Sequence, residues 1–237
     1  MDDFLRVSSR SENLPWTLYN ARPISEVEHT VNLDLDAINS QYADDPEGLI
    51  RWAVGLGKKS VVTSNFRPFA AVILHMCTRE QPEIPVLWMD NGYATPATYQ
   101  FADELTQQLK LNLHIYHPRR SRAHREAVEG VETPGVGDPR LVPFTQEVKL
   151  EPFERAVREM KPEIWFTAVR GEDTAERAEM KPVSITRNGL IKVAPLLKWS
   201  SKDMHEYCKK HGLPNNFDYF DPTKVEDNRE CGLHTVS

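Results

Sequence analysis

From residue 58 to residue 212, short apolar runs alternate with segments whose apolar residues recur every three or four positions. The short runs predict buried strands, and the longer spacing predicts amphipathic helices. The predicted strands are 60–64, 86–89, 113–116 and 164–169. This alternation implies right-handed crossovers and an α/β fold: an open, mostly parallel twisted sheet flanked by helices. The ligand site of such a sheet lies beyond the carboxyl ends of its strands.

Local sequence signals predict where two of the helices begin and end. Thr95 followed by Pro96 is typical of a helix start, with threonine as the capping residue and proline in the first turn. Ser200, with Asp203 three residues later, predicts a second capped helix, which Gly212 ends. This second helix is expected to be scaffolding that places the segment after it.

The pattern divides the chain into three stretches. Residues 1–57 predict an irregular lead-in followed by two helices, and residues 58–212 predict the α/β nucleotide-binding core. Residues 213–237 show no periodicity and predict a mobile C-terminal tail. Inside the core, residues 118–149 predict a helix followed by a loop. The Asn-Gly dipeptide at 188–189 predicts the turn of a β-hairpin.

Length and charge narrow the class of protein. The 237 residues suit one large α/β domain with appendages, and the net charge is −6 with a pI near 5.8. No basic cluster is dense enough to track a phosphate backbone, so we expect no nucleic-acid partner. The four arginines between 119 and 125 are expected on a solvated loop or helix face.

The N-terminus and the hydropathy of the chain bear on its location. No apolar run approaches the roughly 20 residues that a membrane helix needs, so we expect no membrane partner. The first residues also lack the basic-then-apolar order of a signal peptide. The expectation is therefore a soluble, cytoplasmic protein.

The three cysteines are isolated from one another. They are too few and too scattered for a disulfide framework or a four-thiolate site, so we expect no bound metal. Cys77 and Cys208 fall on apolar helix faces, where cysteine behaves as a small hydrophobic residue. Cys231 lies near the end of the chain, and Arg229 and His234 can supply the positive charge that a thiolate needs.

The string Glu-Cys-Gly-Leu-His at 230–234 is the most specific motif of the chain. It resembles the C-terminal signature of the thioredoxin-dependent phosphoadenylyl sulfate (PAPS) reductases, members of the sulfonucleotide reductase and adenine nucleotide alpha-hydrolase-like family. The resemblance extends over about residues 58–234 and keeps the family's order along the chain. Iron–sulfur relatives that act on adenylyl sulfate carry a Cys-Cys pair where this chain has Phe144 and Thr145. Their absence here implies the branch without an iron–sulfur cluster.

The turn after the first predicted strand is similar to the family's phosphate loop only in part. It reads Thr-Ser-Asn-Phe-Arg-Pro at 63–68, where the family usually has serines and a glycine. Hydroxyls and backbone N–H groups at a helix N-terminus suit a phosphate, so Thr63, Ser64 and Asn65 are candidate binding residues. Arg67 can supply by charge what the backbone lacks. The alternative is an ordinary turn.

Three further segments resemble the family and add candidate binding residues. Asp90 and Gly92 match its Leu-Asp-Thr-Gly-Tyr stretch, although Asp-Asn-Gly is also a common turn. Lys149 matches the lysine of a Lys-Val-Glu-Pro-Leu segment. Arg170 and Arg177 match two residues of an arginine loop, and guanidiniums suit phosphate and sulfate. A mixed-charge surface turn is the alternative for this loop, and we expect binding by Arg170 more than by Arg177.

The resemblance implies reduction of PAPS to sulfite and adenosine 3′,5′-bisphosphate through a thiosulfonate on Cys231. It implies reduced thioredoxin or glutaredoxin as the electron donor, no bound cofactor, and a homodimer. Lys149, Arg170 and His234 are expected to hold the sulfonate and the phosphates, and Arg229 is expected to add positive charge near the cysteine.

Other functions stay open at this stage. Adenylyl sulfate is the alternative substrate. A re-purposed relative that binds a nucleotide or a thiol partner without reducing PAPS is the alternative function, because the turn at 63–68 and the arginine loop both depart from the family pattern. An enzyme that splits ATP between its α and β phosphates is disfavoured, because it would need an intact Ser-Gly-Gly-type loop and no terminal cysteine.

Overall fold

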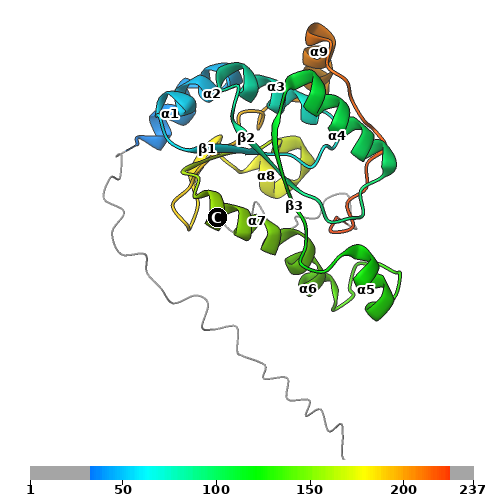
Figure 1. Ribbon diagram of the computed structural model, residues 1–237. Coiled ribbons are helices and arrows are strands. Elements are labelled where there is room, and N and C mark those ends of the chain that lie inside the picture. Colours follow the sequence, from blue (N-terminus) through cyan, green and yellow to red (C-terminus); the bar gives the residue numbers. More distant parts are fainter. Residues whose placement is uncertain (1–32, 225–237) are drawn as a thin grey trace, which may run out of the picture. The chain divides into compact units, whose positions relative to one another are not determined.

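A six-stranded sheet forms the centre of the structure, a computed structural model that describes residues 33–224 (Figure 1). Its strands lie in the order β3-β2-β1-β4-β6-β5. All neighbouring strands are parallel except β5 and β6, which are antiparallel. The mostly parallel sheet is therefore confirmed, and so is the hairpin at the Asn-Gly turn. The strands are β1 Ser60–Thr63, β2 Pro85–Met89, β3 Asn112–Tyr116, β4 Ile164–Phe166, β5 Val183–Ile185 and β6 Ile191–Val193.

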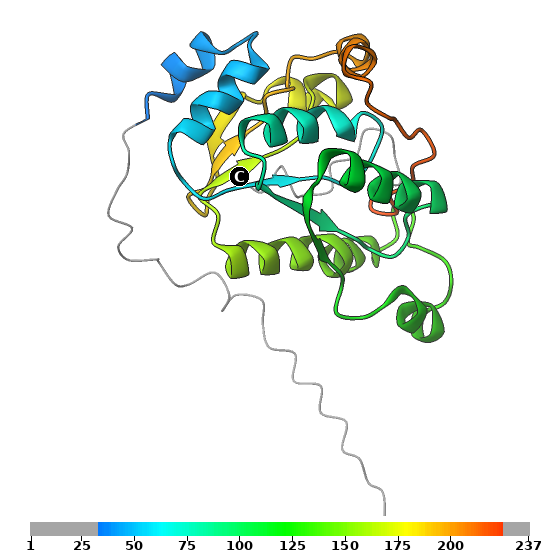
Figure 2. The ribbon, with the colours of Figure 1, turned by 45° about the horizontal axis from the view of Figure 1, so that its top comes forward.

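Helices cover both faces of the sheet. Figure 2 shows α3 and α4 on one face and α7 on the other, and α7 contacts β2 and β3. The α-helices are α1 Leu35–Gln41, α2 Pro46–Gly55, α3 Ala70–Glu80, α4 Pro96–Leu109, α5 Arg122–Glu129, α6 Leu141–Thr145, α7 Glu151–Met160, α8 Ala175–Ala178 and α9 Ser201–His211. In the part of the chain that the structure describes, no helix has the length and apolarity to cross a membrane.

The predicted capping signals operate as expected. The side chain of Thr95 accepts a hydrogen bond from the N–H of Thr98 at the start of α4. Ser200 and Asp203 form a reciprocal capping box at the start of α9. Gly212 follows that helix in the left-handed conformation, with φ of 62°, which glycine adopts at little cost. These short-range interactions explain why both helix starts were predictable.

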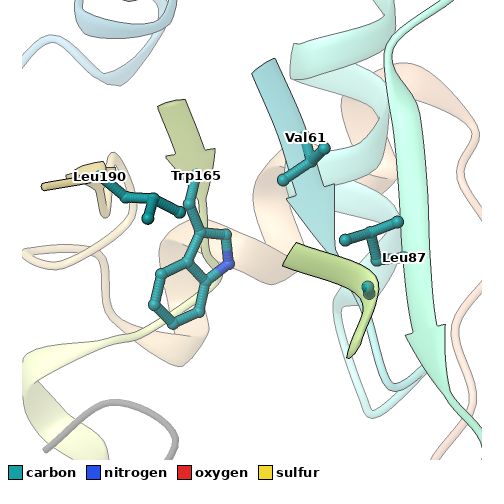
Figure 3. Packing of buried hydrophobic residues seen from close by; sticks show 5 residues of the cluster. Val61, Leu87, Trp165 and Leu190 are labelled. Atoms are coloured by element: carbon teal, nitrogen blue, oxygen red, sulfur yellow. The ribbon is translucent and has the colours of Figure 1, made fainter. Parts of the chain in front are cut away.

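The core between the sheet and α7 is a compact apolar cluster. Its buried members come from three strands, from α7 and from the residue before β6 (Figure 3): Val61, Leu87, Ala156, Trp165 and Leu190. Parallel pairing aligns β1 with β4 so that Val61 lies opposite Trp165. Burying an aliphatic or aromatic side chain of this size contributes about 1.5–3 kcal/mol. This packing holds β1 and β4 side by side, and their carboxyl ends lie at the same edge of the sheet.

The prediction of a loop up to residue 149 is wrong from Leu141 onward. There α6 continues into a π-helix, Gln146–Leu150, and then directly into α7. Pro143 favoured a loop, but it falls in the first turn of α6, where a missing N–H costs no helical hydrogen bond. The predicted strand at 164–169 also ends earlier, at Phe166.

Candidate functional site

A cavity opens at the carboxyl ends of β1 and β4. From β1 the chain adds β2 and β3 on one side, and β4 and the later strands lie on the other side, so β1 and β4 flank the point where the strand order switches. Open α/β sheets bind their ligands at this switch point. Six of the predicted binding residues line the cavity, together with Lys224: Thr63, Ser64, Asn65, Arg67, Lys149 and Arg177. Among residues 33–224 the lining contains four cationic side chains and no carboxylate, so the described walls present positive charge.

The turn between β1 and α3 forms one wall of the cavity. The hydroxyl of Ser64 accepts the N–H of Phe66, and Phe66 has a left-handed backbone with φ of 52°. Phe69, which also has a left-handed backbone, is the residue before α3. Its side chain makes no capping hydrogen bond to the first N–H groups of that helix. The hydroxyl of Thr63 already accepts the indole N–H of Trp165 at 2.9 Å. The Thr63 side chain is therefore held by a neighbouring strand of the sheet. The turn that follows it, and the start of α3, line the cavity.

Three arginines surround one partly buried carboxylate beside this turn. Asp173 accepts hydrogen bonds from Arg67 at 2.8 Å, Arg170 at 2.8 Å and Arg177 at 2.9 Å. Burial opposes ionisation of Asp173, but the three guanidiniums hold its pKa below the ordinary value. Arg177 lines the cavity, whereas Arg170 is turned toward Ser201, to which it donates at 3.0 Å. The structure therefore places Arg177, rather than Arg170, on the cavity wall.

Replacing Asp173 with asparagine is expected to lower the free energy of unfolding at pH 7 by about 3 kcal/mol, because the buried Arg177 and the partly buried Arg67 and Arg170 lose their shared counter-ion. The pKa of Asp173 is lowered in the folded state, so its contribution is present above the usual carboxyl pKa and disappears as pH falls through the lowered value. Urea denaturation should show a large difference in unfolding free energy between variant and wild type at pH 7, and a smaller difference at about pH 3. The same difference at both values would contradict this role.

Lys149 forms the opposite side of the cavity from within the π-helix. Such local widening of a helix is frequent at functional sites. The ammonium of Lys149 donates to Asp221 at 2.6 Å and to Thr223 at 3.0 Å, and all three residues are buried. Burial opposes ionisation of Asp221, but Lys149 and Thr223 keep the pKa of this carboxyl below its ordinary value. The ammonium of Lys149 thus lies at the cavity edge, with one carboxylate behind it.

Residues 213–224, which we call the strap, run from the end of α9 back to this cavity. Asn215 accepts the N–H of Phe69 at 2.7 Å, and the carbonyl of Asp218 accepts the hydroxyl of Thr95 at 2.7 Å. The strap therefore ties the starts of α3 and α4 together before it reaches Lys149. Its pattern predicted no regular element and it has none, but it also contained no signal for these distant contacts. The roles of Tyr219, Asp221 and Thr223 were missed for that reason.

Asp90 and Gly92 lie in the turn after β2, outside the cavity lining. One oxygen of Asp90 accepts the N–H of Gly92 at 2.9 Å and the hydroxyl of Tyr99 at 2.8 Å. Gly92 has φ of 82°, and a side chain there would meet the Cβ of Arg122 at 3.2 Å. Both residues are therefore required by the turn itself, and only the preceding Met89 reaches the cavity lining.

The arginine-rich stretch is largely the solvated face that its composition predicted, with Arg119 and Arg122 exposed and Arg125 as the exception. Arg125 is only 2% exposed and donates to the carbonyls of Arg120 at 2.6 Å and Asn91 at 3.2 Å. Its guanidinium lies 5.5 Å from the ring centre of Tyr93. The prediction is wrong for Arg125 because the turn after β2 and the aromatic ring give the guanidinium buried partners. Arg125 thereby supports the backbone of the Asp90 turn.

Cys77 and Cys208 are buried core residues, as predicted. Burial raises the pKa of the Cys208 thiol to about 11 and raises that of Cys77 as well. Both therefore stay protonated at neutral pH and are poor nucleophiles. Cys231, Arg229 and His234 lie outside the described residues. Among residues 33–224, no cluster of His, Cys, Asp and Glu has the arrangement of a metal site.

Solved structures share the architecture. A phosphoadenylyl-sulfate (PAPS) reductase from Candida auris, solved as a phosphate complex, superposes with a TM-score of 0.66 at 23% identity, covering 77% of this chain and 87% of that one. An FMN adenylyltransferase from Candida glabrata gives 0.52 at 12% identity, covering 73% and 56%. At these identities the likeness concerns the fold, which is the adenine nucleotide alpha-hydrolase-like arrangement.

Sequence relatives define the family. A phosphoadenosine 5′-phosphosulfate reductase from Klebsiella pneumoniae is 34% identical over 222 residues, which cover 80% of this chain and 86% of the relative. One from Synechococcus is 39% identical over 184 residues, covering 76% and 78%. The family model of the phosphoadenosine phosphosulfate reductase domain matches residues 59–220, from the residue before β1 into the strap. The chain belongs to the phosphoadenosine phosphosulfate reductase family.

Proposed function

We propose that this protein reduces PAPS to sulfite and adenosine 3′,5′-bisphosphate, with a redoxin as the electron donor. Family membership supports reduction of a sulfonucleotide. The observation that carries the proposal is the cavity at the switch point of the sheet, where Arg67, Lys149, Arg177 and Lys224 converge and where the described part of the chain places no carboxylate in the lining. A phosphosulfate is an anion with two charged groups, and preorganised cations in a half-enclosed site suit it.

The chemistry begins with the thiolate of Cys231. Its electron pair forms a bond to the sulfur of PAPS, the bond from that sulfur to the bridging oxygen breaks, and adenosine 3′,5′-bisphosphate leaves with the oxygen. A thiosulfonate remains on Cys231. A thiolate of reduced thioredoxin or glutaredoxin then attacks the Cys231 sulfur, and sulfite leaves with the electron pair of the broken bond. The second thiol of the donor resolves the mixed disulfide, which restores Cys231 and oxidises the donor.

The distance along the chain allows Cys231 to reach the cavity. Lys224 lines the cavity and precedes Cys231 by seven residues. Seven residues span up to about 24 Å when extended. Cys77 and Cys208 are buried with raised thiol pKa values, so Cys231 is the remaining candidate nucleophile.

The charged residues have separate tasks in this proposal. Lys149 and Arg177 contact the sulfonate and the phosphate, because both line the cavity. Arg67 also lines it, and Arg170 acts from behind through their shared partner Asp173. Arg229 and His234 are proposed to stabilise the thiolate. We further propose a cytoplasmic homodimer that needs no bound cofactor.

Sulfite release tests the proposal. Purified protein with reduced thioredoxin is expected to release sulfite from PAPS, and the same assay with adenylyl sulfate decides between the two substrates. A rate with PAPS that exceeds the rate with adenylyl sulfate by about a hundredfold would match recognition of the 3′-phosphate. No sulfite from either nucleotide, with thioredoxin or with glutaredoxin, would overturn the proposal in favour of a re-purposed nucleotide-binding relative.

A further inference from the structure

A chain of hydrogen bonds joins the two walls of the cavity through the strap. Asn65, in the turn after β1, donates to the hydroxyl of Tyr219 at 2.6 Å. That hydroxyl donates to Asp221 at 3.4 Å, and the same oxygen of Asp221 accepts the ammonium of Lys149 at 2.6 Å. The bridge Asn65–Tyr219–Asp221–Lys149 thus runs from the turn after β1 to the π-helix. Two of its four members, Asn65 and Lys149, line the cavity.

The carboxylate at the centre of the bridge is fully engaged. The second oxygen of Asp221 accepts the hydroxyl of Thr223 at 2.6 Å and its N–H at 3.0 Å. Asp221 is 7% exposed and Lys149 is 9% exposed. A buried ion pair adds little net stability compared with apolar residues of the same volume. The arrangement is therefore better explained by the geometry that it imposes on the strap and on Lys149.

We propose that Asp221 and Tyr219 are positioning residues, which seat the strap so that Cys231 is presented to the anion held by Lys149. This inference rests on the proposed function. The strap ends at Lys224, and only six residues separate Lys224 from Cys231. Fixing the start of so short a segment restricts where its cysteine can go. Restricting a nucleophile to the reactive region raises its effective concentration, and a small misplacement can cost about a hundredfold in rate.

Asp221 also affects the affinity of the cavity for anions. Its carboxylate shares Lys149 with any anion that enters, so it offsets part of the positive charge in the empty site. Removing that charge leaves Lys149 more available to a phosphate or a sulfonate. The loss of Asp221 therefore has two opposite effects: anions bind more tightly, and transfer to Cys231 becomes slower. A residue that served stability alone would weaken both properties together.

Two measurements on three variants test this inference. For Asp221→Asn we expect the rate of adduct formation on Cys231 at saturating PAPS to fall by about tenfold or more. We expect the affinity for adenosine 3′,5′-bisphosphate, measured by calorimetry, to rise severalfold. Tyr219→Phe keeps the ion pair and breaks the bridge, so it should slow the adduct with unchanged affinity. Asp218→Asn removes the same charge from an exposed position on the strap and should change neither property.

The outcomes separate the inference from the proposed function. The inference is overturned if Asp221→Asn binds the bisphosphate no more tightly than wild type does. It is also overturned if Asp221→Asn forms the adduct at the wild-type rate. Thermal unfolding identifies a variant that fails to fold, and Tyr219→Phe then carries the test of positioning. A wild-type protein that forms no adduct contradicts the proposed function, whereas the bisphosphate affinities of Asp221→Asn and Asp218→Asn still decide the role of Asp221.

Discussion

Replacing Cys231 with serine is expected to reduce sulfite release from PAPS by about 10⁴-fold or more, which is the effect of losing a nucleophile. A serine hydroxyl stays protonated at neutral pH, so it attacks sulfur poorly. Any sulfate ester that formed on serine would also lack the sulfur–sulfur bond that a thiol can cleave. The measurement is steady-state sulfite production with reduced thioredoxin in excess, with the folded fraction checked by thermal unfolding.

The other two cysteines supply matched controls. Cys208→Ala and Cys77→Ala each remove a thiol whose pKa is raised by burial, so neither should change the rate per folded molecule by more than about twofold. Each is expected to lower the free energy of unfolding by about 1 kcal/mol, because a small cavity replaces the sulfur. If Cys208→Ala lost sulfite release while Cys231→Ser stayed active, Cys208 would be the nucleophile and our assignment of Cys231 would be wrong.

Replacing Lys149 with alanine is expected to have the second largest effect, on stability and binding together. The substitution leaves Asp221 charged and buried without its ammonium partner, which costs about 3–5 kcal/mol of folding free energy. It also removes a cation from the cavity wall, so the affinity for adenosine 3′,5′-bisphosphate should fall by at least about tenfold. Urea denaturation and calorimetry measure the two effects separately.

An exposed lysine serves as the control for Lys149. Lys202 on α9 has a side chain that is 82% exposed, with a distant partner in Glu206 at 3.9 Å. Lys202→Ala should change the free energy of unfolding by no more than about 0.5 kcal/mol and leave bisphosphate affinity intact. The double variant Lys149→Ala with Asp221→Ala should recover part of the lost stability, because no unpaired buried charge remains. An unfolding free energy of Lys149→Ala equal to that of wild type would contradict the role of the buried Lys149–Asp221 pair.

Elements that depend on neighbours in sequence were predictable. The caps at Thr95 and Ser200 satisfy N–H groups three residues away, so their signals are contained in four residues of sequence. The order of strands and helices followed from apolar spacing in the same way, and the mostly parallel character of the sheet followed from that order. The position of the cavity at the carboxyl ends of the strands was a consequence of this topology.

Features that depend on distant pairs were not predictable from spacing. Lys149 and Asp221 are 72 positions apart, and nothing near either residue indicates the other. Arg170 and Arg177 were identified by resemblance, and Arg67 was identified as a departure from the family's phosphate loop. Their common carboxylate, Asp173, was counted only as part of a mixed-charge turn. Burial of Arg125 likewise depends on Tyr93, which an adjacent turn brings beneath it. Tertiary partners decide each of these outcomes, and no local preference encodes them.

The central claim is that Cys231 takes the sulfonate directly from PAPS. The measurement that tests it most directly is the intact mass of freshly reduced protein after mixing with PAPS in the absence of any thiol donor. We predict a mass increase of about 80 Da, located on the peptide that contains Cys231 and lost when reduced thioredoxin is added. An unchanged mass, or the same increase in the Cys231→Ser variant, would contradict the account.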